Sequence, residues 1–228
     1  MPKRIKQFWV LDFDRCLADV DALSERFLDI TEQVTSINRS HIEHARSEAE
    51  RRGESFDQYA AIQTRVSPDE MKQIISLFIS GQASEAYLMP GASALLEYVM
   101  RRSERSGGIL TYGSEHWQKL KIQAALGSRR VPYVITSHPY KSREIGSWYD
   151  VGSTSFHIPS ALSPEDTAAD EVILVDDKAI AFEELPEHAR GYWFQSGELL
   201  PSQAGTVGRT VTIVRQSLAQ IIKQEQSR

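Results

Sequence analysis

The sequence predicts an α/β protein in which a doubly wound, Rossmann-like parallel sheet core carries an inserted α-helical domain. Two observations predict this fold class. Short apolar runs that suit buried strands alternate with amphipathic helices at the start of the chain and throughout its second half. Between these parts, about seventy residues have helical periodicity and no strand pattern. We therefore expect a core formed by residues 1–18 and 88–228 and a helical domain formed by residues 19–87.

The composition limits the classes of function. The chain has 228 residues, of which 41% are hydrophobic and 25% charged, as is typical of a soluble globular protein. Its net charge is -5 and no basic stripe dominates, so we expect no nucleic-acid partner. The single cysteine, Cys16, excludes an internal disulfide and a cysteine-based zinc site. No apolar run could span a bilayer or form a signal region, so we expect a cytoplasmic protein, monomeric or weakly dimeric, that does not bind membranes.

The first predicted strand ends in two carboxylates. The run Phe8–Leu11 is apolar, short and bounded by charge, which favours a buried strand over a core helix. Asp12 and Asp14 follow it and point to the same side while the chain stays extended. Such charges repel each other unless a cation or a proton lies between them. An isolated Asp-x-Asp would also suit a solvated turn.

The helical domain is predicted from spacing and from one start signal. Apolar residues three and four positions apart form one helical face: Leu23, Phe27, Ile30, Val34 and Ile37. Ser67, Pro68 and Glu70 begin another helix, because serine caps the first turn, proline suits it, and glutamate three residues later completes a capping box.

The chain returns to the alternating pattern at Pro90-Gly91. A helix follows, and then come the further strands, expected at Ile109–Thr111, Pro132–Thr136, Val172–Val175, Tyr192–Phe194 and Thr210–Ile213. A helix beginning at Ser114 separates the first two of these strands, and a helix through Leu218 closes the chain. Residues 142–170 contain several glycines and prolines, and we expect them to be mostly loop.

Three of these strands end in polar residues that could meet at one edge of the sheet. They are the Asp12 and Asp14 pair, then Thr111, then the pair Asp176 and Asp177. Ligands of open parallel sheets bind at the carboxyl ends of the strands. Four carboxylates with no interleaved cysteine or histidine form a hard oxygen site, which suits Mg²⁺. An Asp-Asp pair alone would often be only a helix cap, but a second pair at another strand end makes that interpretation weaker.

The order of these motifs resembles that of a known superfamily. Asp12-Phe13-Asp14, Thr111 after an apolar strand, Lys141, and Val175-Asp176-Asp177 resemble the four motifs of the haloacid dehalogenase-like hydrolases. The helical insertion directly after the first motif, and the return at Pro90-Gly91, resemble the group in which a helical cap domain is inserted there. The resemblance covers nearly the whole chain.

The resemblance implies roles for the matching residues. Asp12 would be the nucleophile, and Asp14 would protonate the leaving group and then take a proton from water. Thr111 and Lys141 would bind phosphate, with Lys141 offsetting negative charge. The Mg²⁺ ligands implied are Asp12, Asp14 (through its backbone carbonyl), Asp176 and Asp177. Lys121 competes with Lys141, but Lys141 is preferred because it follows the strand Pro132–Thr136.

The chain departs from the family pattern directly after Asp14. The family usually has Gly-Thr there, and this chain has Arg15-Cys16. Glycine gives the turn conformational freedom, so Arg15 must either adopt an allowed conformation or carry strain. Cys16 is most simply a small buried residue in place of threonine.

The resemblance implies a Mg²⁺-dependent phosphatase that hydrolyses a small phosphorylated metabolite through an aspartyl-phosphate. Two alternatives stay open: a phosphomutase or another phosphoryl transferase, and a binding protein that kept the fold and lost turnover. Dehalogenation is less favoured, because Asp14 supplies the acid that phosphoester cleavage needs. The sequence does not identify the substrate.

Overall fold

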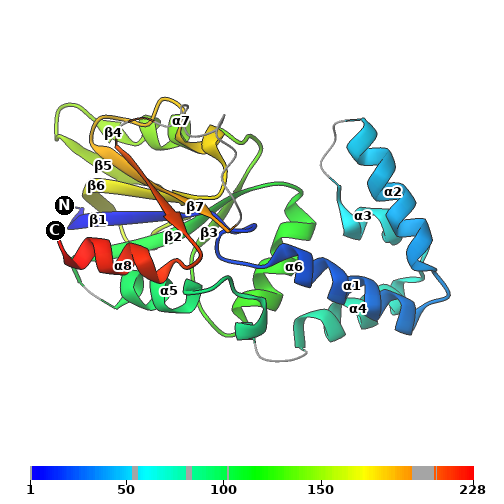
Figure 1. Ribbon diagram of the computed structural model, residues 1–228. Helices are drawn as coiled ribbons and strands as arrows, with labels where there is room; N and C mark the ends of the chain where they lie inside the picture. Colours follow the sequence, from blue (N-terminus) through cyan, green and yellow to red (C-terminus); the bar gives the residue numbers. More distant parts are fainter. Residues whose placement is uncertain (1, 53–55, 81–83, 102, 197–207, 209) are drawn as a thin grey trace. The chain divides into compact units, whose positions relative to one another are not determined.

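The computed structural model describes residues 2–52, 56–80, 84–101, 103–196, 208 and 210–228 (Figure 1). The chain divides into two compact units. The core unit comprises Met1–Ala18, Leu88–Tyr112 and Arg130–Arg228, and the helical unit comprises Asp19–Tyr87 and Gly113–Arg129. The expected insertion, residues 19–87, lies wholly in the helical unit. Residues 113–129, which we expected in the core, group with the helical unit instead.

The core unit contains a mostly parallel sheet, which confirms the predicted fold class. Its parallel strands lie in the order β3-β2-β1-β6-β7-β8. Their bounds are β1 (Lys3–Leu11), β2 (Arg105–Tyr112), β3 (Tyr133–Thr136), β6 (Thr167–Asp176), β7 (Ala189–Gln195) and β8 (Val211–Arg215). Every strand predicted from an apolar run is present, with ends that differ by a few residues.

Residues 142–170 are not mostly loop, so that prediction is wrong. They include most of helix α7 (Lys141–Ser147) and a short antiparallel hairpin, β4 (Tyr149–Asp150) and β5 (Ser155–Ile158). Strand β5 runs antiparallel to the first part of β6, where Phe156 is opposite Ala169. The second part of β6 borders β7. The side chain of Phe156 is fully buried in the core, which holds the hairpin to the sheet.

Helices cover both faces of the sheet, as a doubly wound fold requires. Alternation along β1 sends Phe8 and Val10 into one core layer, which also contains Ile145 of α7. Trp9 points to the other face, where its ring packs edge-on against Tyr98 of α5 (Ala92–Met100) at 5.9 Å. Helices α5 and α8 (Ala219–Gln226) pack together on that face, and the short helix η2 (Ala179–Phe182) packs with α7.

Two glycines lie inside β2, before Ile109, the residue at which the strand was predicted to begin. A β-carbon at Gly107 would lie 2.6 Å from Cγ1 of Val99, and one at Gly108 would lie 2.9 Å from Cδ2 of Leu162. Glycine is therefore required here by close packing on both faces of the strand. The strand begins at Arg105, four residues earlier than predicted.

The helical unit is built around aromatic packing. Its elements are α1 (Val20–Val34), α2 (Arg39–Arg51), α3 (Gln58–Gln63), α4 (Pro68–Ser80), η1 (Ser84–Tyr87) and α6 (Glu115–Leu126). The ring of Trp117 on α6 lies 4.9 Å from that of Phe27 on α1 and 5.8 Å from that of Phe78 on α4. This packing is why α6 groups with the inserted helices.

The capping box predicted at the start of α4 is confirmed. The backbone N–H of Ser67 donates to the Glu70 carboxylate at 2.7 Å, and the backbone N–H of Glu70 donates to the Ser67 hydroxyl at 3.3 Å. Both partners satisfy donors that a helix terminus leaves open.

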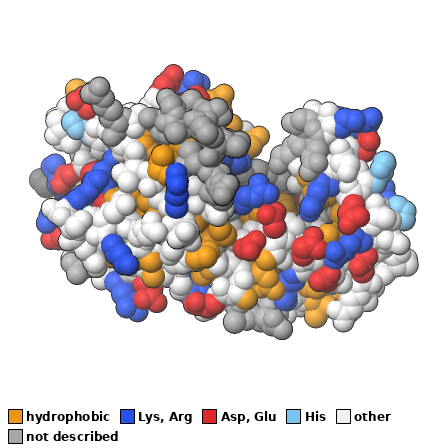
Figure 2. Space-filling view, in the orientation of Figure 1, with side chains coloured by type: hydrophobic (Ala, Val, Ile, Leu, Met, Phe, Trp, Pro, Cys, Tyr) orange, Lys and Arg blue, Asp and Glu red, His pale blue; other side chains and the backbone are white. Residues whose placement is uncertain are grey.

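The surface carries charges of both signs. On the face shown in Figure 2, the coloured basic and acidic side chains are interspersed, and no uniformly basic area extends over them. This distribution gives no support to nucleic-acid binding through that face. Among the described helices, none is both long and apolar enough to cross a membrane.

Candidate active site

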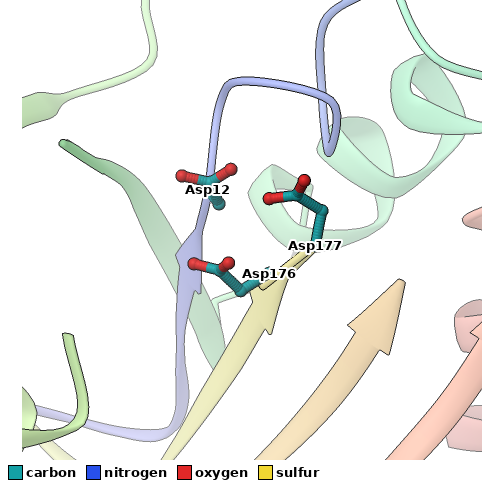
Figure 3. Close-up of side chains that lie close together, drawn as sticks. All are labelled: Asp12, Asp176 and Asp177. Atoms are coloured by element: carbon teal, nitrogen blue, oxygen red, sulfur yellow. The ribbon is translucent and has the colours of Figure 1, made fainter. Parts of the chain in front are cut away.

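The sheet register brings the predicted site residues to one edge of the core unit. Leu11 in β1 is paired with Ile109 of β2 on one side and with Val175 of β6 on the other. Asp12 and Asp176 are therefore the next residues of two adjacent parallel strands, and they emerge together (Figure 3). Thr111 occupies the corresponding end of β2. The register thus places the ends of these three strands at the same edge of the sheet.

Three of the four predicted carboxylates form a compact cluster. Asp12, Asp176 and Asp177 each offer an oxygen, and these oxygens lie within 4.8 Å of one another. Figure 3 shows the three carboxylates directed toward a common space. Asp12 is 5% exposed and Asp176 is 1% exposed. The Asp14 carboxylate does not belong to this cluster, so a contribution of Asp14 to a metal would come from its backbone carbonyl, as the resemblance implies.

Lys141 lies inside the cluster. It is the first residue of α7, and its ammonium group donates to Oδ1 of Asp12 and, at 2.5 Å, to Oδ2 of Asp176. The Lys141 side chain is 4% exposed. Lys121, the competing candidate, belongs to the helical unit, where its ammonium lies 5.7 Å from the centre of the Trp117 ring. Lys141 can reach the carboxylates because α7 follows β3, which runs parallel to β2 and ends at the same edge of the sheet.

Burial and mutual repulsion control the ionisation of the cluster. Burial raises the pKa of Asp12 well above its ordinary value; Lys141 opposes this increase, and the charges of Asp176 and Asp177 add to it. Burial, followed by the charge of Asp176, raises the pKa of Asp177 to about 6. Burial alone would lower the pKa of Lys141, but Asp12 and Asp176 outweigh it and raise the pKa above its ordinary value. The site therefore concentrates more negative charge than one lysine offsets.

Two oxygens of the site lack hydrogen-bond partners. The Thr111 hydroxyl and Oδ1 of Asp177 are buried and accept or donate no hydrogen bond within the described part of the chain. Buried polar atoms are nearly always paired in folded proteins, so unpaired ones at a predicted ligand site mark positions for a ligand. A phosphate oxygen would suit the Thr111 hydroxyl, and a cation would suit Asp177.

The turn after β1 contains Arg15, the position at which the chain departs from the pattern that it resembles. The φ angle of Arg15 is 58°, in the left-handed region that glycine adopts without steric penalty. The family glycine would therefore match the conformation, and Arg15 adopts it as a non-glycine residue. The Arg15 backbone N–H donates to the carbonyl of Ala18 at 2.9 Å, which closes the turn.

Cys16 is structural. Its side chain is fully buried, and its thiol lies 3.7 Å from the carbonyl oxygen of Val175. Burial raises the pKa of the Cys16 thiol, and the charge of Asp12 adds to the increase. A neutral, buried thiol is a poor nucleophile, in agreement with the interpretation of Cys16 as a small core residue.

Sequence reasoning missed the groups that orient the second carboxylate pair. The backbone N–H of Lys178 donates to Oδ1 of Asp176 at 2.8 Å, and the indole N–H of Trp193 donates to the Asp177 carbonyl at 2.9 Å. The first bond is an Asx turn, which an aspartate two residues before the donor can indicate. The second joins β7 to the end of β6 and has no local sequence signal.

The residues present fit a divalent cation such as Mg²⁺. All side-chain donors in the cluster are carboxylate oxygens, the ligand type that Mg²⁺ prefers, and one of them is buried without a partner. Asp12, Asp177 or Asp176, and the Asp14 carbonyl would hold the ion.

Comparisons with known proteins agree with this fold. No protein-family model and no curated protein sequence matches the chain. A solved structure from Burkholderia xenovorans LB400, assigned as a haloacid dehalogenase-like hydrolase, is 15% identical, with 98% of each chain covered and a TM-score of 0.63. Another, from Thermotoga maritima and assigned as a β-phosphoglucomutase, is 13% identical, with 97% of this chain and 99% of that chain covered and a TM-score of 0.52. The chain has the fold of the haloacid dehalogenase-like hydrolases.

Proposed function

We propose that the protein is a Mg²⁺-dependent phosphatase that acts on a small phosphorylated metabolite through an aspartyl-phosphate. The observation that carries this proposal is the contact of the Lys141 ammonium with both Asp12 and Asp176 inside the buried carboxylate cluster. A cation fixed between two carboxylates at a strand end suits an anionic substrate, because it reduces the repulsion that a phosphate would meet.

In this mechanism Asp12 attacks the phosphorus atom with one carboxylate oxygen. The oxygen–phosphorus bond forms as the bond to the leaving group breaks, and the Asp14 carboxyl gives its proton to the leaving oxygen. Asp14, now a carboxylate, then accepts a proton from the water that attacks the same phosphorus. Inorganic phosphate leaves, and Asp12 is regenerated.

The other residues act on charge and orientation. The Thr111 hydroxyl donates to one phosphate oxygen, and the Lys141 ammonium offsets charge on the nucleophile and the phosphate. Bound Mg²⁺ would supply the positive charge that the excess of carboxylates requires. The Lys178 and Trp193 hydrogen bonds hold the second carboxylate pair in place.

Phosphate release from a panel of phosphorylated metabolites, with Mg²⁺ and with EDTA, tests the proposal. Mg²⁺-dependent release from at least one substrate supports a phosphatase. Transfer of the phosphoryl group to a second hydroxyl compound, without phosphate release, would instead support the phosphomutase alternative. Lack of turnover across the panel, with Mg²⁺ still bound, would support a binding protein.

A further inference from the structure

A polar pocket lies at the amino-terminal ends of the core strands, opposite the ends that carry the carboxylate cluster. It has a volume of about 430 Å³ and is lined by the beginnings of β1, β2 and β6 together with the loops around them. Parallel strands advance about 3.3 Å per residue, so the nine residues from Lys3 to Asp12 place this pocket roughly 30 Å from the carboxylate cluster. A pocket of this size can hold a small molecule.

The described lining of this pocket is strongly basic, in a protein whose net charge is -5. It contains one carboxylate, that of Glu165, and four cations: Lys3, Arg101, Arg105 and Arg130. The excess of three positive charges in one hollow is the reverse of the arrangement at the Asp12 edge. Such a hollow attracts small anions.

Two of these cations have no carboxylate partner among the described residues. Arg130 is exposed, and none of the described carboxylates forms an ion pair with it. Arg105 is partly buried, and its guanidinium lies 3.7 Å from the centre of the Tyr98 ring. Stacking on an aromatic ring holds a guanidinium in one plane and leaves its N–H edge for an oxyanion.

Among the residues that the structure describes, the carboxylate contacts of the other two cations are exposed ion pairs. Lys3 pairs with Glu165 at 2.8 Å, and Arg101 pairs with Glu97 at 3.2 Å. In both pairs each side chain is more than half exposed. Exposed pairs of this kind contribute little stability, so an anion in the pocket could recruit both cations.

We propose that this pocket binds a phosphate-bearing anion at a site separate from the Asp12 cluster. Arg105 and Arg130 supply the main charge-assisted hydrogen bonds, and Lys3 and Arg101 add electrostatic attraction. Free phosphate and the phosphate group of a small metabolite share this chemistry.

Isothermal titration of the full chain in EDTA tests the proposal, with inorganic phosphate and adenosine monophosphate as separate probes. Without a divalent cation, the carboxylates of the Asp12 edge repel an anion, so binding there is suppressed. We expect one site per chain with a dissociation constant of about 1 mM or tighter. Tighter binding of adenosine monophosphate than of phosphate would identify an organic phosphate as the ligand, and equal binding would identify free phosphate.

Variants assign the binding to the pocket. Arg130→Ala should weaken it about tenfold, because a charge-assisted hydrogen bond is lost. Arg4→Ala removes another exposed arginine, which pairs with Asp170 outside the pocket, and should leave the binding unchanged. No binding of either probe, or binding that Arg130→Ala does not weaken, would overturn the proposal. None of these outcomes depends on catalysis at Asp12.

Discussion

The ammonium of Lys141 lies 2.5 Å from Oδ2 of Asp176 and also contacts Asp12, so one buried cation joins the ends of two adjacent strands. The contact offsets only part of the negative charge of the three clustered carboxylates. The remaining negative charge is therefore balanced only when a second cation or a proton is bound.

Lys141→Met should impair both catalysis and stability. It removes the charge that offsets Asp12 and Asp176, so phosphate release should fall by at least about 10²-fold. In EDTA the variant should melt at a lower temperature than the wild type, because the buried carboxylates lose their partner. Mg²⁺ should then raise the melting temperature of the variant more than that of the wild type.

Lys121→Met is the matched comparison, since Lys121 is also a buried lysine but belongs to the helical unit. We expect it to retain Mg²⁺-dependent phosphate release. A large loss for Lys121→Met with little change for Lys141→Met would transfer the phosphate-binding role to Lys121.

Asp14→Asn should separate the acid–base role from the nucleophilic one. We expect turnover to decrease by about 10²–10⁴-fold, as is typical for a positioned acid–base group. For leaving groups that depart without protonation, the first step should be spared and the slow step should be hydrolysis of the intermediate. Steady-state and burst kinetics with aryl phosphates of graded leaving-group pKa measure this. An equal loss of the first step for all leaving groups is inconsistent with Asp14 as the acid.

Arg15 should tolerate glycine better than alanine. Its φ of 58° is unfavourable for residues with a β-carbon, so Arg15→Gly should be more stable than Arg15→Ala by about 1 kcal/mol. Both variants lose the arginine side chain, so their difference isolates the backbone effect. Urea denaturation measures it, and equal midpoints would show that the turn carries no strain.

Acid should weaken the hydrogen-bond network that Arg190 forms with Glu225 and Glu171, away from the carboxylate cluster. Arg190 donates to Glu225 at 2.6 Å and to Glu171, and it joins β7 to α8 and β6. Burial opposes ionisation of Glu225, but hydrogen bonds from Arg190 and Tyr192 outweigh it and hold the Glu225 pKa below its ordinary value of 4.5. This stabilisation is complete above that value and is lost as the pH falls through the lowered pKa.

The Glu225→Gln variant has no titrating group at position 225. It should therefore lose less stability than the wild type when the pH is lowered from neutral to about 3. Urea midpoints measured across that range test this prediction. A wild type and a variant with the same pH dependence would show that Glu225 does not contribute to acid unfolding.

The strands and the site could be predicted where the signal is local. Apolar runs that end in polar residues, such as the one before Asp12, were sufficient to locate β1, β2 and β6, and parallel pairing then determined which ends meet. Lys141 was preferred to Lys121 because it follows the strand predicted at Pro132–Thr136. Each of these strands was visible as an apolar run of a few consecutive residues.

The features that sequence reasoning missed depend on contacts between distant segments. The hairpin of β4 and β5 is held by Phe156 against the core, and its strands of two and four residues are too short for the sequence pattern to predict them. Helix α6 groups with the inserted helices because Trp117 packs on Phe27. The Trp193 bond to Asp177 also joins separate strands. The two partners of each contact are too far apart in the sequence for a short window to contain both.

Detection of a phosphorylated Asp12 is the decisive test of the covalent mechanism. The Asp14→Asn variant is mixed with Mg²⁺ and acetyl phosphate, whose leaving group needs no acid, quenched in acid, and reduced with borohydride. We expect residue 12 to be converted to homoserine, which mass spectrometry detects, because the intermediate forms and its hydrolysis is slow. Release of phosphate by this variant with residue 12 unmodified would contradict the covalent mechanism.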